Sequence, residues 1–251
     1  VIKQHEDNWQ LLWSAAKNYQ YTDHTGYMIA GKFERGFHRG GEKYVNALDR
    51  DRVRALQLMA QAMKIAEIAE NQSLVAGFYQ SFAGMWLLNR YNNQSSWELQ
   101  AFTDLSKLPD YEDGYPYRGS ETRGAAVDES GNPVFYQTPI SFESSINDGE
   151  RWRWCLMMAV EKNPDIEDSV LWTMASFYRQ QFGVQTMASY GWWGRSGDSG
   201  DTEDVSGTYS VHTLADDESI AKMASGIQRF HLPVEFNYIK IYETLAANQN
   251  G

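Results

Sequence analysis

The sequence predicts an all-α fold, an antiparallel array of helix hairpins with long irregular insertions and one small β-hairpin. The first observation behind this is a helical run at residues 51–69, which contains neither Gly nor Pro and is rich in strong helix formers. The second is that a helical spacing of large and small residues recurs in three other stretches. A helical domain without repeats is the alternative that these observations leave open.

Residues 51–69 are the most strongly helical stretch of the chain. Asp49 or Asp51 is expected to cap its N-terminus. The apolar residues form two stripes, one in steps of three and four and one of alanines that recur every seven residues. A helix with two apolar stripes packs between two layers of neighbours, and alanines at heptad spacing allow a second helix to approach closely.

A tetratricopeptide-like repeat accounts for the recurring spacing. The first helix of that repeat carries a large residue, a second large residue at +3, a small one at +4 and an aromatic at +7. A final helical pair is expected at residues 217–230 and 235–247. The stretches that fit the first helix are Leu12, Ala15, Ala16 and Tyr19; Tyr79, Phe82, Ala83 and Trp86; and Leu171, Met174, Ala175 and Tyr178.

Long insertions separate the predicted helices. Residues 21–46 form a Gly-rich excursion, and residues 103–150 contain several Pro and Gly. Within the second insertion, residues 127–136 have β-prone residues on both sides of a Gly-Asn-Pro turn, which predicts a small β-hairpin. Loops of this length in a compact domain usually carry a function or form an interface, or else their assignment as loops is wrong.

Composition excludes several classes of protein. The chain has 251 residues and a net charge of −11, so a nucleic-acid backbone would be repelled. No apolar run reaches the length of about 18 residues that a membrane span needs. A single cysteine, Cys155, excludes an internal disulfide, and the five histidines are scattered without metal-ligand spacing. We therefore predict no metal, no cofactor and no catalytic residues.

The candidate binding residues lie in an aromatic segment after the third of the matching stretches. Tyr190, Trp192 and Trp193 stand beside a loop rich in Gly, Ser and Asp, and they are predicted to form a stacking platform for a glycan or a peptide. The loop itself contains four carboxylates, which leaves open a calcium site or a solvated acidic loop. These carboxylates are Asp198, Asp201, Glu203 and Asp204.

Long stretches of the sequence resemble the N-terminal helical segment of large bacterial alpha-2-macroglobulin-like proteins, particularly the planctomycete branch. The first three stretches are GYMIAGKFERGFHRGGEKYVNALDRDRVRALQLM at residues 26–59, LPDYEDGY at 108–115 and SFESSINDGERWRW at 141–154. A fourth group lies within residues 182–242 and consists of FGVQTMASYGWWG, HTLADDESIA and FHLPVEFNYIKIY. The resemblance implies an exported, envelope-associated protein that traps proteases. It carries over none of the family's functional residues, because Cys155 lies in WRWCLMM and not in the C-G-E-Q thioester motif.

Three functional hypotheses follow. The first is a non-enzymatic scaffold or interaction module of such a protease-trapping protein, located in the periplasm, the cell envelope or outside the cell. Residues 1–251 would then be a single helical-repeat domain, a fragment of a longer chain, whose partners are other domains of that chain, envelope proteins or proteases. The second is a stand-alone glycan- or peptide-binding module that uses the aromatic segment around Trp192. The third is an all-α hydrolase.

Overall fold

The computed structural model describes residues 4–39, 43–87, 96–116, 124–190 and 211–248. It is about 52% helical and 15% strand, so the all-α prediction is wrong and the fold is mixed α and β. The helices are α1 (Trp9–Tyr19), α2 (Leu48–Ala66), α3 (Gln72–Leu87), α4 (Asp148–Lys162), α5 (Glu167–Phe182) and α6 (Tyr238–Asn248). The strands are β1 (Thr25–Ile29), β2 (Lys32–Arg35), β3 (Lys43–Asn46), β4 (Glu112–Asp113), β5 (Glu218–Met223) and β6 (Gly226–His231).

The chain divides into two compact units. The first comprises Val1–Asn89, Ala101–Glu121 and Thr138–Pro164, and the second comprises Arg90–Gln100, Thr122–Gln137 and Asp165–Gly251. Helices α1 to α4 and the four-stranded sheet belong to the first unit. Helices α5 and α6 and the hairpin β5–β6 belong to the second.

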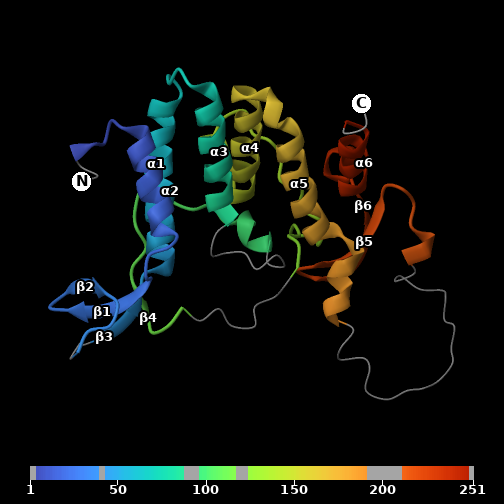
Figure 1. Ribbon diagram of the computed structural model, residues 1–251. Helices are drawn as coiled ribbons and strands as arrows, with labels where there is room; N and C mark the ends of the chain where they lie inside the picture. The colour runs from blue at the N-terminus through green and yellow to red at the C-terminus, as the bar shows by residue number, and fades with distance from the viewer. Residues whose placement is uncertain (1–3, 40–42, 88–95, 117–123, 191–210, 249–251) are drawn as a thin grey trace, which may run out of the picture. The chain divides into compact units, whose positions relative to one another are not determined.

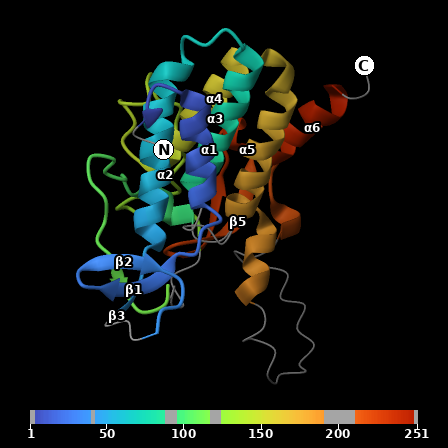
Figure 2. The ribbon, with the colours of Figure 1, turned by 60° about the vertical axis from the view of Figure 1, so that its left-hand side comes forward.

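In the first unit, α1 packs against α2, and α3 packs against α4 (Figure 1). Helix α1 runs toward the sheet and α2 runs away from it, so this pair is antiparallel, as Figure 2 also shows. The Gln61 side chain near the end of α2 accordingly donates to the Glu6 carbonyl, just before α1. Of the residues assigned to a repeat helix on α3, Tyr79, Phe82 and Trp86 have no exposed surface, as their spacing predicts.

The Gly-rich excursion that follows α1 forms part of an antiparallel sheet with strand order β2-β1-β3-β4. Ala30 and Gly31 join β1 to β2 with φ of 48° and 75°, which are the positive values that a two-residue hairpin turn requires. Tyr27 on β1 lies opposite Glu34 on β2 and Tyr44 on β3. This sheet is one of the two elements that contradict the all-α prediction.

Asp51 fixes the sheet to α2. The residue before the helix is Ala47, which makes no side-chain cap, so the prediction that Asp49 or Asp51 caps the helix is wrong. Both Asp51 oxygens instead accept from the Arg35 guanidinium, at 2.7 and 2.5 Å, and one also lies 2.9 Å from His24 Nδ1. The Asp51 carboxylate therefore contacts Arg35 of β2 and His24, the residue before β1. These contacts cover Asp51, which is 3% exposed.

Residues 103–115 are fixed to the rest of the first unit by hydrogen bonds and by a contact between aromatic rings. The Thr103 amide donates to Asp148 at 2.9 Å, and its hydroxyl donates to the same carboxylate at 2.5 Å. Farther along, Tyr111 stacks on Phe33 of β2 with ring centroids 4.7 Å apart. This part of the long insertion also lies along α2, because Arg50 donates to the Pro109 carbonyl and Gln57 donates to the Leu105 carbonyl.

In the second unit, the helix predicted at residues 217–230 is wrong, because these residues form the hairpin β5–β6. Glu218 to Met223 pair with His231 to Gly226 in regular antiparallel register. Ala125 supports the hairpin by donating to the Lys222 carbonyl and accepting from the Ala224 amide. The apolar spacing in this stretch fits a helix, but Gly226 has a φ of 134°, a positive value that a right-handed helix excludes.

Residues 127–136, predicted as a small hairpin, form a turn with one isolated antiparallel bridge, between Val127 and Pro133. The Asp128 carboxylate accepts from the amides of Ser130 and Asn132 at 2.9 and 2.8 Å. These bonds lower the pKa of Asp128. The turn is thus organised by an aspartate side chain and not by paired strands.

The helix pairs α1–α2, α3–α4 and α5–α6 are each interrupted by an insertion. Residues 20–47 separate α1 from α2, residues 88–147 separate α3 from α4, and residues 183–237 separate α5 from α6. The connections from α2 to α3 and from α4 to α5 are short by comparison.

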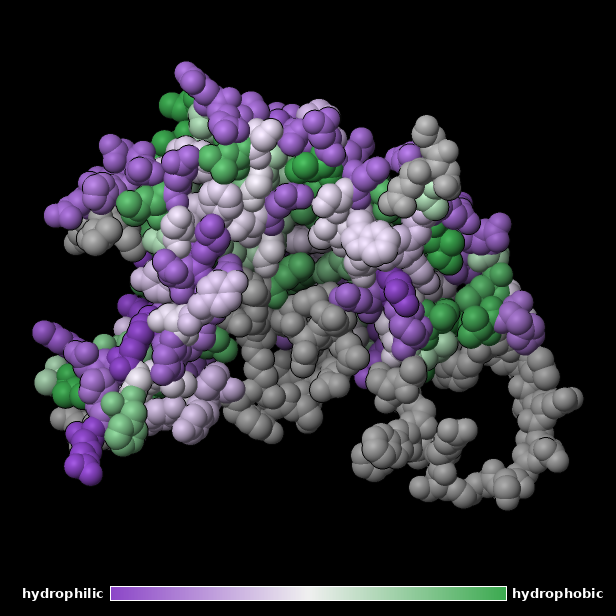
Figure 3. All heavy atoms as spheres, in the orientation of Figure 1, coloured by the Kyte–Doolittle hydropathy of each residue, from purple (hydrophilic) through white to green (hydrophobic). Residues whose placement is uncertain are grey.

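Hydrophilic and hydrophobic side chains are interspersed over the surface drawn in Figure 3. Among the described helices, none has both the length and the apolar character needed to cross a bilayer.

A candidate binding groove between α5 and α6

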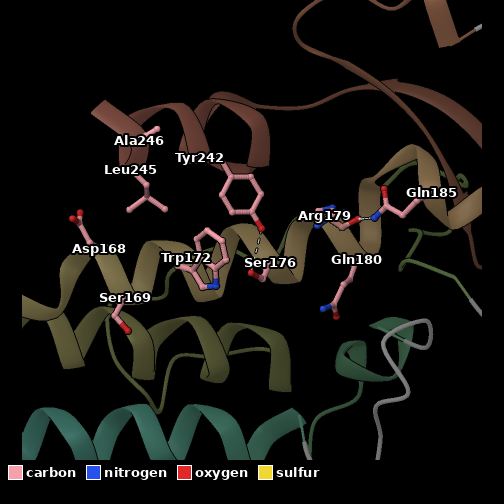
Figure 4. A pocket seen from close by; sticks show the side chains of 10 residues that line it. All are labelled: Asp168, Ser169, Trp172, Ser176, Arg179, Gln180, Gln185, Tyr242, Leu245 and Ala246. Atoms are coloured by element: carbon pink, nitrogen blue, oxygen red, sulfur yellow. Dashed lines mark hydrogen bonds between the residues drawn. The ribbon is translucent and has the colours of Figure 1, made fainter. Parts of the chain in front are cut away.

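A groove of about 830 Å³ lies between α5 and α6 in the second unit. Figure 4 shows side chains from both helices along it. From α5 it is lined by Asp168, Ser169, Trp172, Ser176, Arg179 and Gln180; from α6 by Tyr242, Leu245 and Ala246; and beyond α5 by Gln185.

The spacing of residues along α5 creates two different faces. Val170, Met174 and Phe177 are buried on one face. Trp172 and Arg179 lie on another face, with Ser176 between them, and their steps of four and three residues keep them in line. The acidic residues of the first turn, Glu167 and Asp168, stabilise the start of the helix through its dipole.

Trp172 and Tyr242 form the aromatic centre of the groove. Their ring centroids are 5.1 Å apart and the ring planes are inclined by 65°, so one ring meets the edge of the other. The Tyr242 hydroxyl lies 3.2 Å from the Ser176 hydroxyl, which fixes the tyrosine ring (Figure 4). The Trp172 side chain is nevertheless 60% exposed. The pair thus offers an apolar notch to the solvent.

The two ends of the groove carry opposite charges. At one end, Asp168 accepts a hydrogen bond from the Asn248 amide at 2.9 Å. At the other end, the Gln185 amide donates to the Arg179 carbonyl at 2.6 Å and closes the last turn of α5. Within the described part of the chain, the guanidinium of Arg179 makes no hydrogen bond or ion pair, and Asp168 has no cationic partner.

A second hollow of about 410 Å³ in the same unit is lined in part by polar groups that already serve the fold. The Glu218 carboxylate is bound by Arg229 at 2.5 Å, and this lowers the Glu218 pKa to about 2. The Ser219 hydroxyl donates to the Phe182 carbonyl. Burial raises the pKa of Tyr238. We regard the α5–α6 groove, which is the larger of these two hollows and contains the Trp172–Tyr242 ring pair, as the candidate site.

Most of the binding residues and loop carboxylates predicted from the sequence lie outside the described part of the chain. Tyr190 is the last residue of the 3-10 helix Val184–Tyr190, while Trp192 and Trp193 lie outside the described residues. The acidic residues Asp198, Asp201, Glu203 and Asp204 also lie outside them. Within the described ranges, no group of three or more His, Cys, Asp or Glu side chains could hold a metal ion.

Sequence reasoning did not single out Trp172 or Tyr242. It assigned Leu171, Met174 and Tyr178 to the packing face of α5 and gave no role to the tryptophan beside them. A signal was present, because Trp172 falls out of phase with that apolar stripe, on the face that solvent reaches. Tyr242 lies far away in the sequence, and no local pattern connects the two rings.

No protein-family model, curated protein or solved structure matches this chain. The macroglobulin resemblance accordingly depends on the sequence stretches alone, and it stays a prediction.

Proposed function

We propose that the chain is a non-enzymatic interaction module that binds a polypeptide segment in the groove between α5 and α6. The observation that carries the proposal is the exposure of Trp172 beside Tyr242 inside a groove of about 830 Å³. Exposed tryptophan and tyrosine anchors in a concave site supply a large share of the energy in protein recognition.

The shape and the charges of the groove favour a peptide over a glycan. A sugar ring stacks on a flat aromatic face, whereas Trp172 and Tyr242 meet at 65° and form a notch that suits a protruding apolar side chain. The unpaired guanidinium of Arg179 offers a bidentate site for a carboxylate, which peptides supply and neutral glycans lack.

The proposal can be tested by selecting a random peptide library and screening a glycan array against the full chain. We would compare the wild type with Trp172→Ala, and use Phe37→Ala as the control, since Phe37 is an 84% exposed ring in the other unit. We expect peptides to be enriched by the wild type and by Phe37→Ala but not by Trp172→Ala. Equal enrichment by Trp172→Ala, or binding of glycans alone, would overturn the proposal.

We propose further that this module belongs to an exported protease-trapping protein of the macroglobulin type. Support comes from the four groups of stretches described above, which extend over most of the chain. An antibody to this chain should detect, in cells of the source organism, a protein several times larger than 28.7 kDa. Trapping of proteases by that protein should be lost after methylamine treatment. A native protein of about the size of this chain would contradict the assignment but not the binding groove.

A further inference from the structure

The charged and aromatic groups of the groove stand at fixed intervals along α5. Asp168, Trp172 and Arg179 project from a single helix, so the helical rise of about 1.5 Å per residue sets their separation. Trp172 lies about 6 Å along the axis from Asp168, and Arg179 lies about 10.5 Å beyond Trp172. Any ligand that contacts all of them must present three groups at those intervals.

An extended peptide meets this requirement in one register. In the polyproline II conformation a peptide advances about 3.1 Å per residue, so the two intervals correspond to about two and about three residues. We infer that the groove binds an extended segment with a proline at Trp172 and Tyr242, a basic residue two positions to one side at Asp168, and an acidic residue three positions to the other side at Arg179. This inference rests on the proposed function and specifies the ligand of the same groove.

Proline is the residue that the aromatic notch favours. Proline-rich segments bind to grooves lined by aromatic side chains, and they lose little entropy because the extended conformation exists before binding. Such a backbone has no internal hydrogen bonds, so its carbonyls need donors. The exposed Trp172 indole N–H has no hydrogen-bond partner among the described residues and is available for this role.

Charge complementarity supports the two flanking positions. The Arg179 guanidinium makes no hydrogen bond or ion pair, and the Asp168 carboxylate accepts only from the neutral Asn248 amide, within the ranges that the structure describes. A segment with one basic and one acidic residue is neutral overall. The chain's net charge of −11 therefore does not repel it, as it would repel a purely acidic peptide.

The test uses fluorescence anisotropy with the full chain and short labelled peptides with blocked ends. The probes are K-A-P-A-A-E and its reverse E-A-A-P-A-K, because the peptide can run in either direction along α5. Register controls move the acidic residue next to the proline, as in K-A-P-E-A-A. We expect one of the two probes to bind about fivefold more tightly than its register control, the value of one well-placed ion pair.

Charge reversal identifies the residue that reads the acidic position. Arg179→Glu should weaken binding of the preferred probe about fivefold and should strengthen binding of the matching probe that carries Lys in place of Glu. The control is Arg39→Glu, the same change at an exposed residue of the other unit, which should leave both affinities unchanged. Trp172→Ala should weaken all of these probes by about thirtyfold or more.

The outcomes separate this inference from the proposed function. If library peptides depend on Trp172 but affinity depends neither on the position of the acidic residue nor on the charge at residue 179, the register is refuted and the groove remains a binding site. If Trp172→Ala changes the binding of no peptide, both the register and the proposed function are refuted.

Discussion

The attachment of the sheet to α2 through Asp51 gives the sharpest prediction on stability. In the wild type the two Asp51 oxygens make three contacts, two with Arg35 and one with His24. In Asp51→Asn the carboxylate becomes an amide, which has only one acceptor oxygen for these contacts. Removing one partner of a buried ion pair costs about 3–5 kcal/mol. Because the Arg35 side chain is 33% exposed and can still reach water, we reduce this to about 2–3 kcal/mol.

The loss should appear as local opening of the sheet. Amide hydrogen exchange in β1, β2 and β3 should accelerate about 30- to 150-fold, because about 1.4 kcal/mol corresponds to a factor of ten. Exchange in α5 and α6, which belong to the other unit, should not change.

Asp49→Asn is the matched control, since it makes the same change two residues away in the same helix. The Asp49 side chain is 45% exposed and lies 3.0 Å from Arg52, so its loss should accelerate exchange about fivefold or less. If Asp51→Asn stays within that same range, the sheet is held mainly by its ring contacts and the ion-pair reasoning is refuted.

Further predictions concern buried, crowded and titrating groups. Cys155 is fully buried and burial raises the pKa of its thiol, so a maleimide should label it only after denaturation; labelling of the native protein would contradict this. Gly124→Ala should lower the free energy of unfolding by about 1–3 kcal/mol in urea, because a Cβ there would lie 2.4 Å from the backbone of Met223. Gly84→Ala, in open space on α3, should raise it by about 0.5–1 kcal/mol, and a loss would count against the packing of that helix. Arg229 lowers the pKa of Glu218 from 4.5 to about 2, so its stabilisation is present above pH 4.5 and lost as the pH falls through about 2. The melting temperature of Glu218→Gln should thus fall less than that of the wild type over this range; an equal fall would refute the role of the ion pair.

The helical parts of the fold could be predicted because their buried apolar residues recur at helical intervals within a short stretch of sequence. Tyr79, Phe82 and Trp86 recur at helical intervals, and all are buried on α3. The same rule misled at residues 217–230, where Ile220, Met223 and Ile227 also recur at helical intervals. There the pairing of β5 with β6 across a two-residue turn and the support from Ala125 favour strands, and the contact with Ala125 joins residues far apart in the sequence.

The four-stranded sheet had a local signal that carries less weight than helical spacing. Gly31 lies between two short runs that contain β-prone residues, Tyr27 and Ile29 before it and Phe33 after it, as a glycine does in a two-residue hairpin turn. The pairing of β4 with β3 joins residues far apart in sequence, and no window of sequence contains it. The candidate groove is of the same kind, since it exists only once α6 lies beside α5.

The insertions within helix pairs also govern the order in which the chain can fold during synthesis. Helix α3 is complete at Leu87, but its partner α4 begins only at Asp148. A ribosome adding about 5–20 residues per second therefore leaves the apolar face of α3 without α4 for about 3–12 s. During that time Phe82 and Trp86, which are fully buried in the finished protein, are exposed to other nascent chains. The position of this insertion thus delays the burial of these two side chains until synthesis has passed Asp148.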